Sequence, residues 1–139
     1  MKKSTFKADI GNLEDVIDFV DNNFPDDEVS MEKRLFVELA VQEAFTNIAQ
    51  YAYAPESGEV EIIIENTTDP LGVVITLIDT GKRFNPLEYS KASSEGKKNK
   101  EGGLGIKFIK ESMDALGYSY EDGKNILTMT KFLEEDEDE

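Results

Sequence analysis

The sequence predicts an α+β fold, a two-layer sandwich in which helices cover one face of a mixed, largely antiparallel sheet. Segments with strand and helix patterns follow in the order strand, two helices, two strands, a loop, a helix and two strands. Consecutive strand patterns separated by short turns favour antiparallel hairpins. Because strands and helices do not alternate regularly, the parallel sheet of a Rossmann domain is disfavoured.

The first half of the chain contains one strand and two helices. Residues 4–10 alternate weakly and predict an edge strand. We expect Asn12 to cap a helix that runs to residue 23, and Ser30 to cap a longer helix that runs to about residue 54. The longer helix repeats apolar residues at helical spacing, which predicts a buried face made of Val37, Ala40, Val41, Ala44, Phe45, Ile48 and Ala52.

The second half begins with two strands, over residues 60–65 and 73–78, and a turn is predicted over residues 66–72. The strand at 73–78 is almost continuously apolar, which favours a central place in the sheet. Residues 79–103 hold few large apolar side chains, and such a long irregular segment is typically functional or disordered. A helix from Leu104 to Gly117 and a hairpin of residues 118–133 turning at Asp122-Gly123 complete the fold.

Composition places the chain among globular proteins of one domain. Its 139 residues suit a single domain over residues 1–133, and the six acidic residues 134–139 predict a solvated, disordered tail. No apolar run is long enough for a membrane helix and no secretory signal is visible. We therefore expect a cytoplasmic protein that makes no membrane contact.

Two residue types are missing from the sequence. The absence of cysteine excludes disulfides, thiolate zinc sites and cysteine nucleophiles. The absence of histidine excludes histidine acid/base catalysis and most transition-metal sites. Any chemistry must therefore use carboxylates, amides, hydroxyls and basic side chains.

The charge of the chain is strongly negative but unevenly distributed. A net charge of −15 argues against nucleic acid as a partner. Residues 80–110 nevertheless carry eight basic and only three acidic side chains. This segment favours a local anionic ligand, with a solvated lysine-rich loop as the alternative.

A carboxylate and an amide stand four residues apart on the longer helix. Glu43 and Asn47 lie on the same side of that helix, at the edge of its apolar face. Together their oxygens could position a hydrated Mg²⁺, and the carboxylate could accept a proton from an incoming hydroxyl. The alternative is an ordinary pair of exposed polar side chains.

Asp79 follows directly on the apolar strand and begins the segment Asp79-Thr80-Gly81. A carboxylate at a strand end could accept a hydrogen bond from an exocyclic amine such as that of adenine. Gly81 would allow a tight turn and the close approach of a flat ring. The alternative is a plain turn, for which Asp and Gly are common residues.

Glycines precede the last predicted helix, in the segment Gly102-Gly103-Leu104-Gly105. Glycines that lead into a helix expose backbone N–H groups at its positive end, which is a favourable place for phosphate. The Walker P-loop pattern is absent. By itself this feature is only moderately specific.

The helical Glu-Asn pair, the Asp-x-Gly segment and the glycine segment follow one another in this order along the chain. Together they resemble the N, G1 and G2 boxes of the ATPase superfamily of gyrase, Hsp-type chaperones, histidine kinases and MutL. The closer resemblance is to bacterial anti-sigma-factor serine/threonine kinases. It rests on Glu43-Ala44-Phe45-Thr46-Asn47, on the Asp79, Gly81, Phe84, Asn85 and Pro86 positions, and on Gly102–Ile106 with Met113-Asp114. The resemblance spans roughly residues 36–114 and implies the Bergerat, or histidine kinase-like ATPase, fold.

The resemblance also implies a role for each matching residue. Glu43 would be the general base, Asn47 the Mg²⁺ ligand, and Asp79 the partner of the adenine amine beside Gly81. The remaining positions implied to bind nucleotide are Tyr51, Phe84, Lys100, Gly102, Gly103, Leu104 and Gly105. Tyr51 stands where the family often has histidine, and Lys100 or Glu101 where some members place an arginine near the γ-phosphate.

Cofactors and partners follow from the same resemblance. It implies ATP with Mg²⁺, an anti-sigma antagonist protein as serine acceptor, a sigma factor as a second partner, and a homodimer. An alternative class remains open, a nucleotide-dependent binding module that grips a partner without transferring phosphate. A detached histidine-kinase catalytic domain is less favoured, because the chain contains no histidine and no dimerisation helix pair.

Overall fold

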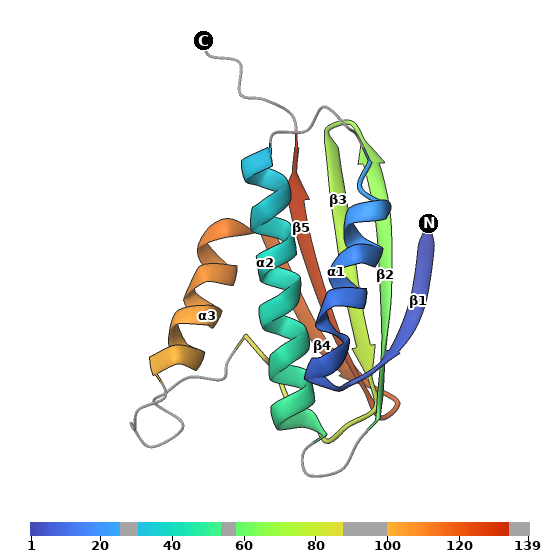
Figure 1. Cartoon of the computed structure of the whole chain (residues 1–139), viewed down its shortest axis with the longest axis vertical. Coiled ribbons are helices and arrows are strands. Elements are labelled where there is room, and N and C mark those ends of the chain that lie inside the picture. The colour runs from blue at the N-terminus through green and yellow to red at the C-terminus, as the bar shows by residue number, and fades with distance from the viewer. Residues whose placement is uncertain (26–30, 54–57, 88–99, 134–139) are drawn as a thin grey trace.

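The computed structural model describes residues 1–25, 31–53, 58–87 and 100–133, with the backbone alone at 100–104. A layer of helices packs on one face of a five-stranded sheet (Figure 1). The strands are β1 (Lys2–Lys7), β2 (Glu59–Thr68), β3 (Leu71–Asp79), β4 (Ala115–Glu121) and β5 (Lys124–Phe132). The helices are α1 (Leu13–Asn22), α2 (Met31–Asn47) and α3 (Lys100–Ser112), with a 3₁₀ turn before α1 (Ile10–Asn12) and a π-helix after α2 (Ile48–Ala52).

The strand order is β1-β2-β3-β5-β4, so β3 lies in the centre of the sheet as predicted. All four described pairings are antiparallel, which makes the sheet uniform where the sequence predicted a mixed one. The reason is that β2–β3 and β4–β5 are hairpins and that β3 and β5 run in opposite directions. The predicted fold class, α+β with helices on one face, is confirmed.

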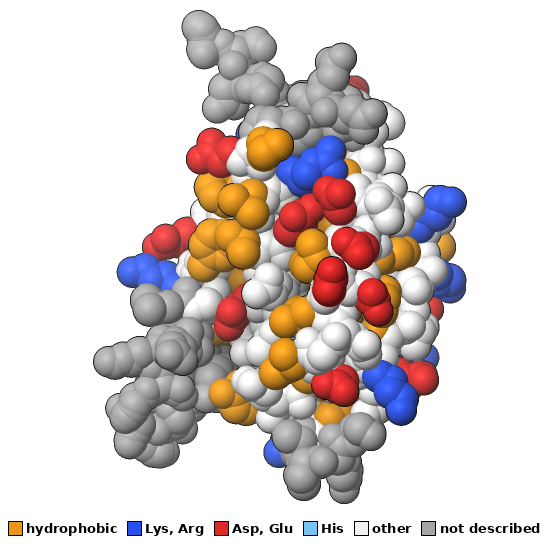
Figure 2. Space-filling model, in the orientation of Figure 1, with side chains coloured by type: hydrophobic (Ala, Val, Ile, Leu, Met, Phe, Trp, Pro, Cys, Tyr) orange, Lys and Arg blue, Asp and Glu red, His pale blue; other side chains and the backbone are white. Residues whose placement is uncertain are grey.

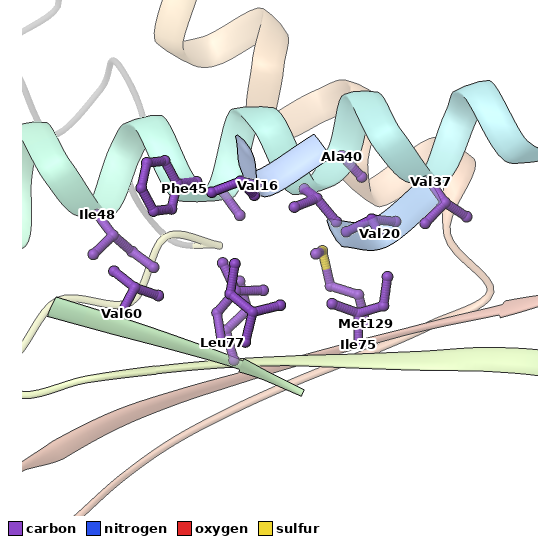
Figure 3. Close-up of a cluster of buried hydrophobic side chains, with 14 of the residues drawn as sticks. Val16, Val20, Val37, Ala40, Phe45, Ile48, Val60, Ile75, Leu77 and Met129 are labelled. Carbon is purple, nitrogen blue, oxygen red and sulfur yellow. The ribbon is translucent and has the colours of Figure 1, made fainter. Parts of the chain in front are cut away.

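The core lies between the helices and the inward face of the sheet (Figure 3). Every member of the predicted apolar face of α2 and its π-helical extension is buried. These side chains meet alternate residues of the strands, because successive strand residues point to opposite faces. The contributing strand residues include Val60, Ile62, Ile75, Leu77, Leu127 and Met129.

Two local expectations in the first half are wrong. Asn12 precedes α1 but makes no side-chain cap, because its amide donates to the Lys7 carbonyl oxygen at 3.0 Å. Asp9 instead caps the preceding 3₁₀ turn through the Gly11 amide. The turn predicted over residues 66–72 is confined to Asp69-Pro70, since the β2–β3 ladder continues to the Thr68–Leu71 pair. Ser30 and the predicted helix end at residue 54 lie outside the described residues.

The last helix is displaced from its predicted position. It begins at Lys100 rather than Leu104 and ends at Ser112 rather than near Gly117. Gly117 lies in β4, opposite Thr128. Strand pairing with β5 from Ala115 onward therefore overrides the helical pattern of the sequence. The predicted hairpin turn is confirmed, with positive φ angles of 54° at Asp122 and 77° at Gly123.

A charged contact joins α1 to α2 at the outer surface of the helical layer. The Arg34 guanidinium lies 2.9 Å from the Asp21 carboxylate and 4.6 Å from the centre of the Phe24 ring. Glu38 lies beside this pair, and burial followed by the nearby Asp21 carboxylate raises its pKa from 4.5 to about 7. Arg34 opposes this shift, and Asp18 adds to it. At neutral pH the ionised form of Glu38 is therefore destabilised by burial and by the Asp21 carboxylate.

We predict that Glu38→Gln stabilises the protein at pH 8. A raised carboxyl pKa means that the folded state binds the proton more tightly, so stability is lost as pH rises from about 4.5 through 7. The gain is about 1 kcal/mol at pH 8, after discounting for solvent screening, and disappears near pH 4.5. Urea unfolding at both pH values measures it, with exposed Glu65→Gln as control. An equal gain at both pH values would contradict this explanation.

Candidate functional site

The predicted site residues Glu43, Asn47 and Tyr51 lie one turn apart along α2 and its π-helical extension. Short π-helical segments occur frequently at functional sites, because their wider turn redirects side chains and backbone groups. Here the extension ends at Ala52, whose carbonyl oxygen accepts a hydrogen bond from the Lys82 amide at 3.0 Å. This bond ties the end of the helix to the loop that follows β3.

Asp79 is the last residue of β3 and is 2% exposed. Its Oδ1 accepts hydrogen bonds of 2.9 Å from the Gly81 amide and from the Asn125 side chain. Burial raises the pKa of Asp79, and the bonds from Asn125 and Gly81 lower it in part. Among the described residues only Oδ1 has hydrogen-bond donors, so Oδ2 can still accept one.

Asn125 organises this loop, and the sequence interpretation missed it. It is 3% exposed and pairs with Asp79 across the β3–β5 ladder. Its Oδ1 accepts from the Phe84 amide at 2.9 Å and from the Tyr118 hydroxyl, and its Nδ2 donates to Asp79 and to the Lys82 carbonyl at 2.9 Å. One signal was available: an asparagine occupies an inward-facing position of a strand whose next inward residues are apolar.

Tyr53 is a second residue that the sequence interpretation missed. Its hydroxyl donates to the Glu59 carbonyl at 2.8 Å and accepts from the Thr80 amide at 2.9 Å. It thereby joins the end of the helix, the start of β2 and the loop after β3. No spacing rule singles out this tyrosine, because its partner Thr80 lies 27 residues away in the sequence.

Gly81 allows a close contact between this loop and the helix. A Cβ atom at this position would lie 2.6 Å from the Ala52 carbonyl oxygen and 2.9 Å from its carbonyl carbon. Backbone atoms cannot move aside as a flexible side chain would. Packing against the Ala52 backbone is therefore a sufficient reason for glycine at position 81. The sequence had suggested a different reason, room for a ligand ring.

Tyr51 and Phe84 are brought together at the same end of the helix. Their ring centres lie 5.7 Å apart with a tilt of 33° between the rings, within the usual range for an aromatic pair. Because the Phe84 amide is bonded to Asn125, the aromatic pair is anchored to the same network as Asp79.

Glu43 and Asn47 lie in the last turns of α2, before the π-helical extension that contains Tyr51. Asn47 is 3% exposed, and its Nδ2 has no hydrogen-bond partner of good geometry among the described residues. Burial raises the pKa of Glu43, and the neighbouring Asn47 amide lowers it in part. An unsatisfied buried donor costs free energy, so a ligand oxygen that accepts a hydrogen bond from Asn47 would remove this cost.

Gly105 brings α3 against Glu43. A Cβ atom on Gly105 would overlap the Glu43 carboxylate in its present position, so a larger residue here would require the Glu43 side chain to move. The first two glycines of the predicted segment, Gly102 and Gly103, lie in the first turn of α3 rather than before it. Their N–H groups are among the first four of the helix, which have no intrahelical acceptor. The side chains of Lys100 and Leu104 lie outside what the structure describes.

These contacts place α2 between the two glycine-containing segments. Gly105 touches it at Glu43 and Gly81 touches it at Ala52. Nine residues of helix separate the two contacts, roughly 13 Å at the usual rise per residue. The Asp79 loop therefore lies at one end of this stretch of helix, and the start of α3 lies at the other.

Comparison with known proteins agrees with this arrangement. The model of the histidine kinase-like ATPase domain matches residues 6–131. The chain belongs to the histidine kinase-like ATPase family. The predicted superfamily is thereby confirmed. Within the described residues, no helix of this ATPase domain is long and apolar enough to cross a membrane.

Relatives of this ATPase domain carry the name serine-protein kinase RsbW. The one from Halalkalibacterium halodurans is 35% identical over 110 residues, which cover 73% of this chain and 64% of the relative. The one from Bacillus mycoides is 30% identical over 107 residues, covering 73% and 65%. The match therefore spans slightly less than two thirds of these relatives' length.

Solved structures confirm the fold. The RsbU and RsbW domains of a Mycobacterium tuberculosis protein match 96% of this chain and 33% of theirs, with a TM-score of 0.65 at 15% identity. A chain of the SiaB–SiaC complex from Pseudomonas aeruginosa matches over 94% of this chain and 89% of its own, with a TM-score of 0.56 at 15% identity.

We predict that Gly81→Ala destabilises the protein by about 1–3 kcal/mol, because the added methyl group would overlap the Ala52 backbone. Gly117→Ala is the matched control, since a Cβ atom there meets nothing within 4 Å. Thermal unfolding of both variants measures the difference. Equal melting temperatures for the two variants would show that the loop and helix are not in this contact.

We predict that Asn125→Ala destabilises the ATPase domain by about 2–3 kcal/mol and weakens ATP binding. The substitution leaves the Phe84 amide and the Lys82 carbonyl oxygen without their side-chain partner and removes a donor from Asp79. Urea unfolding and calorimetric titration with ATP measure the two effects. Asn66→Ala, at an exposed position of β2, is the control. Unchanged ATP affinity in a folded Asn125→Ala protein would contradict the role of this network.

Proposed function

We propose that this ATPase domain is a Mg²⁺·ATP-dependent protein-serine/threonine kinase of the anti-sigma-factor type. The observation that carries the proposal is the position of α2. This helix holds Glu43 and Asn47 between the Asp79 loop and the glycine-containing start of α3. A phosphoryl-transfer enzyme needs a nucleotide site and a carboxylate base close to one another, and in this proposal both would lie along this helix.

Nucleotide binding would begin at Asp79. Its Oδ1 is held by protein donors, so Oδ2 would accept the exocyclic amine of adenine. Tyr51 and Phe84 supply aromatic surface beside this position. At the other end of the site, N–H groups in the first turn of α3, including those of Gly102 and Gly103, would face the phosphates, with Lys100, Leu104 and Gly105 beside them.

The residues present fit a magnesium ion. Asn47 and Glu43 stand one helical turn apart and each carries a side-chain oxygen, whereas the unsatisfied Nδ2 of Asn47 is a donor that would serve a phosphate oxygen and not the ion. Carboxylate and amide oxygens are ligands that Mg²⁺ accepts while it keeps several waters. We assign the side-chain oxygen of Asn47 as the ligand. When bound, the ion would neutralise charge on the phosphates.

Glu43 would take the proton of the acceptor hydroxyl. Burial raises its pKa, which makes the carboxylate a stronger base than an exposed glutamate. Because only the ionised form accepts a proton, activity would fall as pH decreases through this raised pKa. Gly105 leaves room for the carboxylate at the crossing of α2 and α3.

The relatives support the choice of partners. Those named serine-protein kinase RsbW point to a protein substrate with a hydroxyl acceptor, and the SiaB–SiaC structure is of a complex between two proteins. We propose an anti-sigma antagonist protein as the acceptor and a sigma factor as a second partner, with the kinase acting as a homodimer.

Glu43→Gln is expected to retain ATP binding and to lose phosphate transfer by about 10²-fold or more. The amide keeps the size of the side chain but cannot accept the proton. Glu111→Gln is the matched control, because Glu111 lies on the outer face of α3 with a side chain that is 68% exposed. Transfer from radiolabelled ATP to the antagonist protein and calorimetric titration with Mg²⁺·ATP provide the two measurements.

Two results would separate the alternatives. ATP binding without transfer by the unmodified protein would favour a nucleotide-dependent binding module. No binding at millimolar ATP would remove the proposed function altogether.

A further inference from the structure

Helix α2 carries apolar residues on both of its faces. Its inner face fills the core, but Met31, Leu35 and Leu39 are 79%, 48% and 38% exposed. Their spacing of four residues places them on one side of the helix, directed away from the sheet. We call Met31, Leu35 and Leu39 the outer stripe. Single exposed apolar residues need no explanation, whereas three adjacent ones suggest a contact surface.

Neighbouring helices flank the outer stripe within the described residues. Arg34, on one side of α2, contacts Asp21 of α1. Phe36, on the other side, packs edge-to-face on Phe108 of α3 at 5.9 Å. The stripe lies between these two contacts and faces outward. Figure 2 shows hydrophobic side chains gathered over α2 in this region, with acidic side chains beside them over α1.

The acidic side chains form a ridge along the stripe. Glu14, Asp18 and Asp21 recur on one side of α1, and Glu38 of α2 lies next to them. Arg34 is already engaged with Asp21 and Phe24. Burial and the Asp21 carboxylate raise the pKa of Glu38, so a further cation here would relieve repulsion. We call Glu14, Asp18, Asp21 and Glu38 the acidic ridge.

We propose that the outer stripe and the acidic ridge dock a helix of the phosphate-accepting protein, one whose apolar face is bordered by lysine or arginine. An amphipathic helix laid on an apolar stripe is a recurring mode of recognition. Basic residues along one border would meet the ridge, which gives the contact its orientation. The identity of the partner rests on the proposed kinase function, but the surface itself does not.

The position of the stripe favours the acceptor protein. Leu39 lies one turn before Glu43 on the same helix, so a partner seated on the stripe ends beside the proposed base. A second copy of this chain is a poorer occupant. It would bring another acidic ridge to face this one, at this surface of the molecule.

A synthetic peptide tests the surface directly. The probe is a fluorescein-labelled helix of about 18 residues with leucine on one face and lysine on the other. We expect the double variant Leu35→Ser/Leu39→Ser to bind it about tenfold more weakly than the unmodified protein, measured by fluorescence anisotropy without nucleotide. Phe132→Ser is the matched control, since Phe132 is 43% exposed and lies on β5.

The charge requirement has its own pair of variants. Glu14→Gln/Asp18→Asn removes two ridge charges and is expected to weaken binding and reduce its salt dependence. Glu59→Gln/Glu61→Gln removes the same charge from β2 and is expected to leave binding unchanged. A peptide with glutamate in place of lysine is expected not to bind. Amide chemical-shift changes in the unmodified protein should map to α2 and α1, which keeps the test valid if a variant unfolds.

Several outcomes would overturn the docking surface. The first is equal affinity for the peptide in the Leu35→Ser/Leu39→Ser variant and the unmodified protein. The second is a set of amide chemical-shift changes that maps away from α2, and the third is the absence of peptide binding. If the unmodified protein is a dimer and the Leu35→Ser/Leu39→Ser variant is a monomer, the stripe is the contact with a second copy instead. A serine added at either end of the peptide should be labelled from ATP, and binding without such labelling would overturn the acceptor assignment. If Mg²⁺·ATP titration shows no nucleotide binding while the peptide maps to the stripe, the kinase function fails and the surface stands.

Discussion

The hydrogen-bonded contact between Asn125 and Asp79 is the interaction on which the site depends. Both side chains are almost fully buried, at 3% and 2% exposure, and both stand at the same end of neighbouring strands. A buried carboxylate is costly unless donors surround it, and here one oxygen receives two. The same asparagine forms hydrogen bonds with the backbone at Lys82 and Phe84, so β5 holds the loop that carries Gly81 and Phe84. Through Phe84 the loop also contacts the Tyr51 ring at the end of the helix.

Helix α2 is the second organising element, because it serves the core with one face and the site with its C-terminal half. Gly105 and Gly81 each allow a neighbouring backbone to approach it closely, the first at Glu43 and the second at Ala52. Partial burial at these crossings raises the pKa of Glu43, and the nearby Asn47 amide keeps an unsatisfied donor. Burial of the apolar face from Val37 to Ala52 stabilises the helix and offsets the cost of the buried carboxylate and the unsatisfied donor. Membership of the histidine kinase-like ATPase family gives this arrangement a functional context.

Much of the fold could be predicted from local pattern, and the failures have identifiable causes. The apolar face of α2, the central place of β3 and the Asp122-Gly123 turn follow from periodicity and turn chemistry, which act over a few residues. The end of α3 and the length of the β2–β3 hairpin were mispredicted, because ladder pairing between neighbouring strands decides them. In the site, Asp79 and Glu43 could be selected from motif order. Tyr53 could not, because its partner Thr80 lies 27 residues away in sequence. Asn125 offered only the signal of an amide among inward-facing apolar residues, and nothing local indicated its partner Asp79, 46 residues away.

The sequence alone determined the fold class, the family resemblance and the residue types available for chemistry. It did so because side-chain periodicity, turn residues and the absence of cysteine and histidine are properties of the chain itself. Tertiary structure decided which of those residues meet. It showed that Gly81 is needed where its loop meets the α2 extension, that Gly105 lies against Glu43, that Asn125 holds Asp79, and that part of α2 remains apolar on its outer side. The physical reason is that burial, hydrogen bonding and steric contact depend on distances between segments, which no local pattern contains.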